Sequence, residues 1–143
     1  MIKDKPVPVA RVSMTVRRPR RECFLAFTDP EMLSRFWLAD AGERDVDEGA
    51  VMQWRFHGAA DPVTVSCRDM RPDCLMRLEM SNGMRLMLTF DRHDDGGTVV
   101  HYCQCGFPDG TDVADTAASA RRMLTALQAL LEGRAAGGMP SAA

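Results

Sequence analysis

The sequence predicts an α+β fold in which a curved antiparallel sheet of seven strands wraps around one long C-terminal helix. Two observations lead to this prediction. From Asp109 to about Gly133, apolar residues recur at steps of three and four, which is the pattern of an amphipathic helix. Before Asp109, short runs alternate between apolar and polar residues, as half-buried strands do. A helix and a sheet with one apolar face each can bury those faces against one another, which gives a two-layer domain.

The chain opens with one predicted strand and two predicted short helices. Residues 7–16 alternate, and the prolines near their start confine that part of the strand to a sheet edge. Pro19 suits the first turn of one helix. Thr28 or Asp29 can cap a second helix, with Pro30 in its first turn.

Six further strands are predicted before the long helix. They cover residues 41–46, 51–57, 62–70, 74–80, 84–90 and 98–107, and the first of them is the weakest. Short turns such as Ser81-Asn82-Gly83 join successive strands, which predicts an antiparallel meander. The long helix, capped by Asp109, Thr111 or Asp112, completes a single domain of residues 1–133. Residues 134–143 are expected to form a disordered tail.

Composition restricts the class of protein. A net charge of -2 over 143 residues gives no electrostatic reason to expect nucleic acid or a membrane surface as partner. No run reaches the roughly 18 apolar residues of a membrane span, and the start lacks the apolar core of a signal peptide, so we expect a soluble cytoplasmic protein. Five widely spaced cysteines then predict reduced thiols.

Methionine is unusually frequent, with 11 methionines against 6 phenylalanines. Methionine fills irregular space and repacks around varied shapes, so this composition favours an adaptable cavity. A compositional bias without functional meaning is the alternative.

The residues from Val16 to Trp37, VRRPRRECFLAFTDPEMLSRFW, resemble the opening of the START/Bet v 1-like (SRPBCC) superfamily. They are most similar to the branch named for the activator of Hsp90 ATPase. That branch also has an Asp-x-x-x-Gly-(Gly/Ala) turn, matched by Asp45–Ala50, an aromatic residue on the next strand, matched by Trp54, and a Gly-Phe end of the last strand, matched by residues 106–107. The resemblance covers roughly residues 9 to 133.

The resemblance implies a helix-grip fold with a cavity between the long helix and the sheet. Members of the superfamily bind apolar molecules, some cyclise or hydrolyse them, and the eukaryotic namesake of the branch binds a chaperone. Two departures stand out. Ala120 occupies a position where relatives often have a Trp, which would open space, and Phe36-Trp37 replaces a pair that usually begins with Trp. The branch shares no catalytic residues, so none is assigned.

The apolar residues expected to face the helix are the candidate ligand-binding set, with the hydroxyl of Tyr102 and the amide of Gln104 as orienting polar groups. Trp37, Trp54, Tyr102 and Met123 are the residues most expected at a cavity wall. Simple core packing is the alternative for all of them. The full set is Phe27, Phe36, Trp37, Trp54, Met76, Leu78, Leu86, Leu88, Tyr102, Gln104, Ala120, Met123 and Leu127.

Other reactive patterns are incomplete. His101, Cys103 and Cys105 alternate on one strand face, but no fourth ligand stands at a recognisable spacing, and the family register turns all three outward, so we predict no metal and no cofactor. No serine or cysteine lies in a nucleophile motif. His57 could act as a general base at the pocket rim, or be a solvated strand-end residue.

Two functions remain as hypotheses. The first is a carrier, a sensor or an enzyme for a small apolar or aromatic molecule held under the long helix. The second is a stress-related protein-interaction module that contacts a chaperone, as the branch name implies. Homodimerisation through the outer sheet face or a sheet edge is a further hypothesis.

Overall fold

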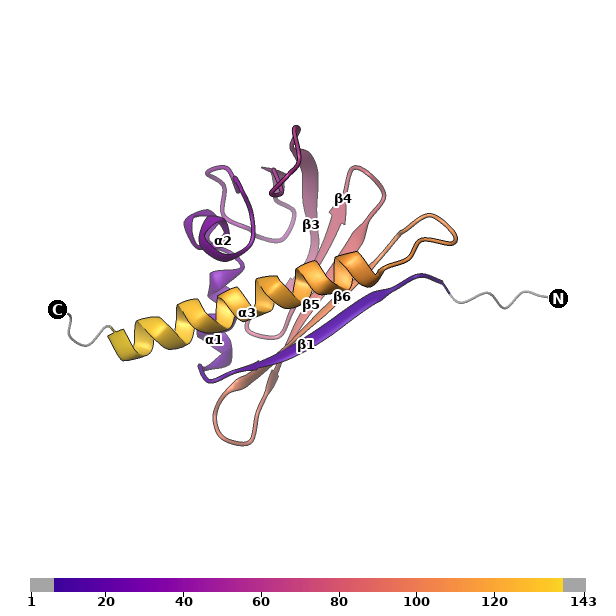
Figure 1. Cartoon of the computed structure of the whole chain (residues 1–143). Coiled ribbons are helices and arrows are strands. Elements are labelled where there is room, and N and C mark those ends of the chain that lie inside the picture. The colour runs from indigo at the N-terminus through magenta and orange to yellow at the C-terminus, as the bar shows by residue number, and fades with distance from the viewer. Residues whose placement is uncertain (1–6, 138–143) are drawn as a thin grey trace.

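The computed structural model describes residues 7–137. They form a curved antiparallel sheet with a long helix packed across its concave side (Figure 1). The elements follow one another as β1 (Ala10–Val16), α1 (Arg20–Ala26), α2 (Pro30–Phe36), β2 (Val51–Trp54), β3 (Val63–Arg71), β4 (Leu75–Met80), β5 (Arg85–Arg92), β6 (Thr98–Cys105) and α3 (Ala114–Gly137). No helix in this part of the chain is long and apolar enough to cross a membrane. The helix-grip arrangement predicted from the sequence is confirmed.

The sheet has six strands, in the order β1-β6-β5-β4-β3-β2, and every neighbouring pair is antiparallel. The predicted seventh strand over residues 41–46 is wrong. Gly42 adopts a φ of 72°, and the hydrogen bonds of the segment go to helix α2 and its start: Ala41 N donates to Ser34 Oγ, and Val46 N donates to Thr28 O. The chain meets the sheet just before this segment, through a bridge between Asp40 and Arg55.

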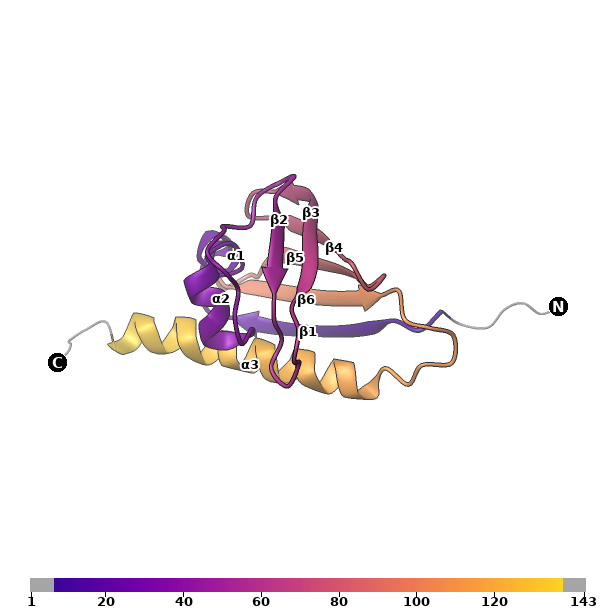
Figure 2. The ribbon, with the colours of Figure 1, turned by 90° about the horizontal axis from the view of Figure 1, so that it is seen from above.

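Both short helices form where the sequence predicts them, but Pro19 is the N-cap of α1 and not part of its first turn. Asp29 is the N-cap of α2, and its side chain accepts a hydrogen bond from Glu31 N at 3.0 Å, while Pro30 occupies the first position, where no N–H is needed. Figure 2 shows both short helices packed beside the C-terminal half of α3, at one end of the sheet. Phe24 of α1 and Leu33 of α2 belong to the same buried cluster as Leu127 of α3, so the short helices pack against that end of the long helix.

Helix α3 begins later and ends later than predicted. Residues 108–111 form a turn instead, in which Thr111 N donates to Pro108 O, and Asp112 Oδ1 then accepts from Ala114 N at 2.9 Å. The helix continues through Gly133 to Gly137. The remainder of the predicted tail, residues 138–143, lies outside the described residues.

Side chains of α3 attach it to the edge strand β1. Gln128 Nε2 donates to Thr15 O at 2.9 Å, and Glu132 Oε2 accepts from Arg17 N at 2.9 Å. These bonds join the helix to backbone groups at the C-terminal end of β1 and directly after it. They fix the position of the C-terminal half of α3 on the sheet.

The core fills the concave side of the sheet under that half of the helix. Leu124 and Leu127 of α3 are fully buried in one cluster with Phe27 and Phe90. Aromatic rings continue the cluster along the sheet through edge-to-face contacts, with Phe27 meeting Phe90 at 5.7 Å and Trp37 at 5.9 Å between ring centroids. Trp37 marks the point where the packed core ends.

Candidate functional site

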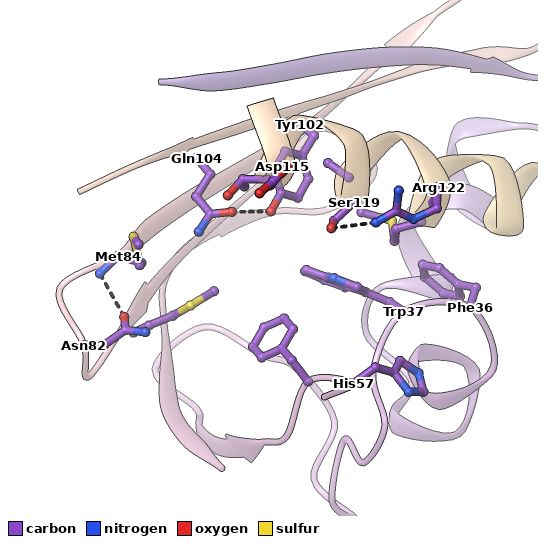
Figure 3. A pocket seen from close by; sticks show the side chains of 15 residues that line it. Phe36, Trp37, His57, Asn82, Met84, Tyr102, Gln104, Asp115, Ser119 and Arg122 are labelled. Carbon is purple, nitrogen blue, oxygen red and sulfur yellow. Dashed lines mark hydrogen bonds between the residues drawn. The ribbon is translucent and has the colours of Figure 1, made fainter. Parts of the chain in front are cut away.

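A pocket of about 600 Å³ lies under the N-terminal half of α3, beyond the end of the packed core (Figure 3). Its walls come from α3, the end of α2, the segment after β2, the β4–β5 hairpin and the end of β6. The lining residues are Phe36, Trp37, Phe56, His57, Met80, Asn82, Met84, Tyr102, Gln104, Asp115, Thr116, Ser119, Ala120, Arg122 and Met123.

Helix α3 presents a mixed face to this pocket. Asp115, Ser119 and Arg122 follow one another at steps of four and three, which places them on one side of the helix. Arg122 Nη2 donates to Ser119 Oγ at 3.0 Å. Ala120 and Met123 form the buried part of the same face, and the small side chain at Ala120 leaves room beneath the helix.

Aromatic rings form the wall opposite the helix. Trp37 stands directly after the last residue of α2, and its ring centroid lies 5.4 Å from that of Trp54, 6.0 Å from Phe56 and 6.4 Å from Tyr102. Phe56 lies beyond β2 because that strand ends at Trp54 and a turn follows, in which Ala59 N donates to Phe56 O. The early end of β2 therefore brings Phe56 and His57 to the pocket.

Strand β6 supplies the polar end of the pocket. Tyr102 and Gln104 share a strand face, and the Tyr102 hydroxyl donates a hydrogen bond to Gln104 Oε1. Burial raises the pKa of Tyr102, which is only 6% exposed, so its phenol stays neutral. At the neighbouring hairpin, Asn82 Oδ1 accepts from Met84 N at 3.1 Å, and Gly83 takes a φ of 92°.

Part of the predicted ligand-binding set lies at this pocket: Phe36, Trp37, Tyr102, Gln104, Ala120 and Met123. The rest is fully buried in the packed core and does not line it: Phe27, Trp54, Met76, Leu78, Leu86, Leu88 and Leu127. Trp54 nevertheless supports the wall from behind, through its contact with Trp37. A ligand contact of any of these residues stays a prediction.

Sequence reasoning missed most of the pocket entrance. Phe56, Met80, Asn82, Met84, Asp115, Thr116, Ser119 and Arg122 line the pocket without having been selected. Met80 and Met84 were predicted as strand residues, Asn82 as part of a turn and Asp115 as a first-turn residue of the helix, and none of them was assigned to a pocket. The signal that could have found them is position, since the ends of strands and the start of the helix meet at one end of the sheet.

His57 lies at the pocket rim, where the sequence placed it as a candidate general base. It is exposed, and in Figure 3 its ring turns away from the centre of the cavity. A role as general base stays a prediction.

The outer face of the sheet holds the other candidate residues. His101 Nδ1 lies 2.6 Å from Ser13 Oγ, and His101 Nε2 lies 3.0 Å from Asp91 Oδ2, so both ring nitrogens have protein partners. Within residues 7–137, no group of three His, Cys, Asp or Glu side chains is placed to hold a metal. Cys103 and Cys105 are partly exposed free thiols, whereas burial raises the pKa of Cys67 to about 11 and keeps that thiol protonated.

A curved sheet around one long helix, with a pocket left at one end, defines a protein of the START/Bet v 1-like class. The family model of the activator of Hsp90 ATPase homolog 1-like proteins matches residues 17–132, and the chain belongs to this family. The resemblance read from residues 16–37 is confirmed.

Solved structures agree with this assignment. Protein SSP2350 from Staphylococcus saprophyticus is 25% identical, with a TM-score of 0.73 over 87% of this chain and 92% of that one. The Aha1 dimer from Colwellia psychrerythraea is 16% identical, with a TM-score of 0.76 over 87% and 96%, and shares the fold. DynU16, from the dynemicin biosynthetic locus, is 20% identical with a TM-score of 0.75 over 89% of this chain, which spans about half (48%) of DynU16. No curated protein matches the sequence.

Proposed function

We propose that the protein binds a small apolar or aromatic molecule in the pocket under the N-terminal half of α3. The observation that carries this proposal is a space of about 600 Å³ bordered by Trp37, Phe56 and three methionines. Ligand sites are typically hollows of about 300 to 1,000 Å³ with apolar walls and a few polar groups, and this pocket has both features.

A second hollow, of about 750 Å³, lies between α1, α2 and the end of α3, and it fits this function less well. Charged side chains make up most of its lining, including the ion pair of Arg18 with Glu22. Such groups are best solvated by water, so an apolar ligand would lose their hydration without compensation. Volume alone does not identify the site.

The polar groups of the pocket suit orientation of a ligand better than reaction with it. Ser119 is the serine of the lining, and it accepts a hydrogen bond from Arg122, a residue that cannot act as a base. Activation of a serine requires a neighbouring base, and among the described residues Ser119 is hydrogen-bonded to neither Asp115 nor His57, the lining residues that could act as one. A carrier or a sensor is therefore the form of the function that these contacts support best.

The test fills the pocket from the helix. Ala120 is 3% exposed and faces the cavity, so Ala120→Trp should abolish binding of a neutral probe, naphthalen-2-ylmethanol, measured by titration calorimetry. The melting temperature should stay equal or rise, because the new ring occupies existing space. Ala129→Trp is the matched control, since Ala129 lies on the exposed face of the same helix. Unchanged binding by Ala120→Trp would contradict the proposal, and so would failure of the unmodified protein to bind.

A chaperone-activating function is the alternative, and it is carried by the family description alone. It is distinguished by a chaperone ATPase assay with the purified protein. Under the ligand-binding proposal, no stimulation is expected, and stimulation that survives Ala120→Trp would favour the alternative.

A further inference from the structure

The hydrogen bonds around the pocket fix which polar atoms remain for a ligand. Asn82 illustrates this most simply. A backbone N–H can only donate, so the bond from Met84 N must end on the carbonyl oxygen of the Asn82 amide. The amide nitrogen of Asn82, with two N–H groups, is then turned toward the cavity, as Figure 3 shows.

Gln104 has the same orientation in the structure, although its partner is a hydroxyl, which can accept as well as donate and does not by itself require that orientation. Its carbonyl oxygen accepts the hydroxyl proton of Tyr102, so its amide nitrogen is left with two donors (Figure 3). Strand β6 therefore offers the pocket a donor, although a glutamine could equally have offered an acceptor.

Arg122 adds a third donor group. Its guanidinium has five N–H groups and no acceptor, and the bond to Ser119 is the one that the structure gives it. Asp115 is the single carboxylate of the lining, and it lies on the exposed first turn of α3, where a negative charge stabilises the helix. Asp115 thus has a structural reason to be there.

We propose that the ligand is a planar aromatic compound whose polar substituents are hydrogen-bond-accepting oxygens, a carboxylate in particular. This proposal rests on the proposed function and adds the chemical class of the ligand. The rings of the compound lie against Trp37, and its oxygens face the nitrogens of Asn82, Gln104 or Arg122. Aromatic amines and other cations are disfavoured at these nitrogens, which can only donate, whereas the acceptors of the lining are the hydroxyl oxygens of Tyr102, Thr116 and Ser119 and the exposed carboxylate of Asp115.

The overall charge of the protein does not favour binding of an anion. A net charge of -2 attracts cations weakly over long range. A preference for anions must therefore come from the local groups of the pocket and cannot be a general charge effect.

The experiment compares three naphthalene probes by titration calorimetry: 2-naphthoate, naphthalen-2-ylmethanol and naphthalen-2-ylmethylammonium. The unmodified protein should bind 2-naphthoate about tenfold or more tighter than the ammonium probe, as expected for charge-assisted hydrogen bonds at a partly exposed site. The alcohol should fall between them.

Two variants exchange donor for acceptor without changing shape. Asn82→Asp keeps an oxygen for Met84 N, and Gln104→Glu keeps an oxygen for the Tyr102 hydroxyl, so both retain the fold's hydrogen bonds. Each should weaken 2-naphthoate binding about tenfold and strengthen ammonium binding, while alcohol binding stays within about twofold. Arg122→Gln should weaken only the anion, and Arg121→Gln, an exposed neighbour outside the pocket lining, is its matched control.

The outcomes separate the two proposals. If the alcohol binds and is blocked by Ala120→Trp, but the anion has no advantage over the cation, the ligand class proposed here is overturned and the proposed function stands. An anion preference that Arg121→Gln reduces as much as Arg122→Gln also overturns it. If none of the probes binds, both proposals fail.

Discussion

The two halves of α3 cover the same sheet with opposite results. The C-terminal half buries Leu127 and Leu131 in a packed core, at 0% and 5% exposure. The N-terminal half covers a pocket of about 600 Å³. Both halves have the same apolar period, so the difference comes from side-chain size and from the elements that pack against each half.

On the closed side, α1 and α2 lie beside the helix (Figure 2), and Gln128 and Glu132 bond to the backbone at and just after the end of β1. On the open side, Ala120 is small, and the opposing residues come from turns and strand ends that lie farther along the curved sheet. A helix-grip fold can thus place its packed core and its pocket under different halves of one helix. The closed half anchors the structure, which leaves the open half free to hold a ligand.

The largest expected effect concerns the closed half of α3, whose buried side chains anchor the helix to the sheet. Leu127→Ala removes a fully buried side chain from the closed half and should lower the free energy of unfolding by about 2 to 5 kcal/mol, measured by urea denaturation. Met123→Ala is the matched variant on the open half. It should cost less, because Met123 borders a space that already exists and water can occupy what it vacates. Equal losses would show that the two halves are equally packed and would break the comparison.

The sequence predicted the closed half better than the open half. The period of the helix and the alternation of β4 and β5 were enough to identify Leu78, Leu88 and Leu127 as inward-facing. The same rules cannot distinguish a packed position from a pocket wall, since both are apolar and inward. For that reason the predicted set mixed Trp37, which lines the pocket, with Trp54, which supports it from the core.

The pocket entrance depends on features that no periodic pattern carries. Asn82 is a turn residue whose donor is defined by one hydrogen bond to Met84, and Arg122 is a helix-surface residue by spacing. The predicted strand over residues 41–46 failed for a related reason, because a glycine with positive φ sends the backbone toward α2. Only the family resemblance pointed to Ala120, as a small residue where relatives often place a large one.

The second-largest expected effect concerns the open half of α3, and it tests whether water reaches Tyr102 at the polar end of the pocket. Tyr102 is the only tyrosine of the chain, and burial raises its pKa above the ordinary value of about 10. The folded protein then keeps this proton at a pH where the unfolded chain releases it. The free energy of unfolding should therefore fall as pH rises through about 10, by at most about 1.4 kcal/mol per pH unit from this group.

The measurement combines tyrosinate absorbance with urea denaturation between pH 8 and pH 11. Tyr102→Phe is the control, because it removes the hydroxyl and should flatten this part of the pH dependence, leaving the part due to Cys23 and Cys67, whose pKa values burial also raises. Ionisation of Tyr102 near its ordinary pKa in the folded protein would mean that water reaches the polar end of the pocket.

The smallest effect concerns the exposed rim of the open half. Asp115 stands in the first turn of α3 and lines the pocket, so Asp115→Asn removes a favourable charge from the helix start and an unfavourable one from any bound anion. The free energy of unfolding should fall by about 0.3 to 1 kcal/mol in urea denaturation. Binding of 2-naphthoate should strengthen by about twofold in calorimetry, since the charge is exposed and screened.

Asp112→Asn is the control, because Asp112 caps the same helix start without lining the pocket. If both variants changed anion binding equally, the effect would belong to the charge of the helix end and not to the pocket. A change confined to Asp115→Asn would show that the rim of the open half acts on a ligand while contributing little to the stability that the closed half provides.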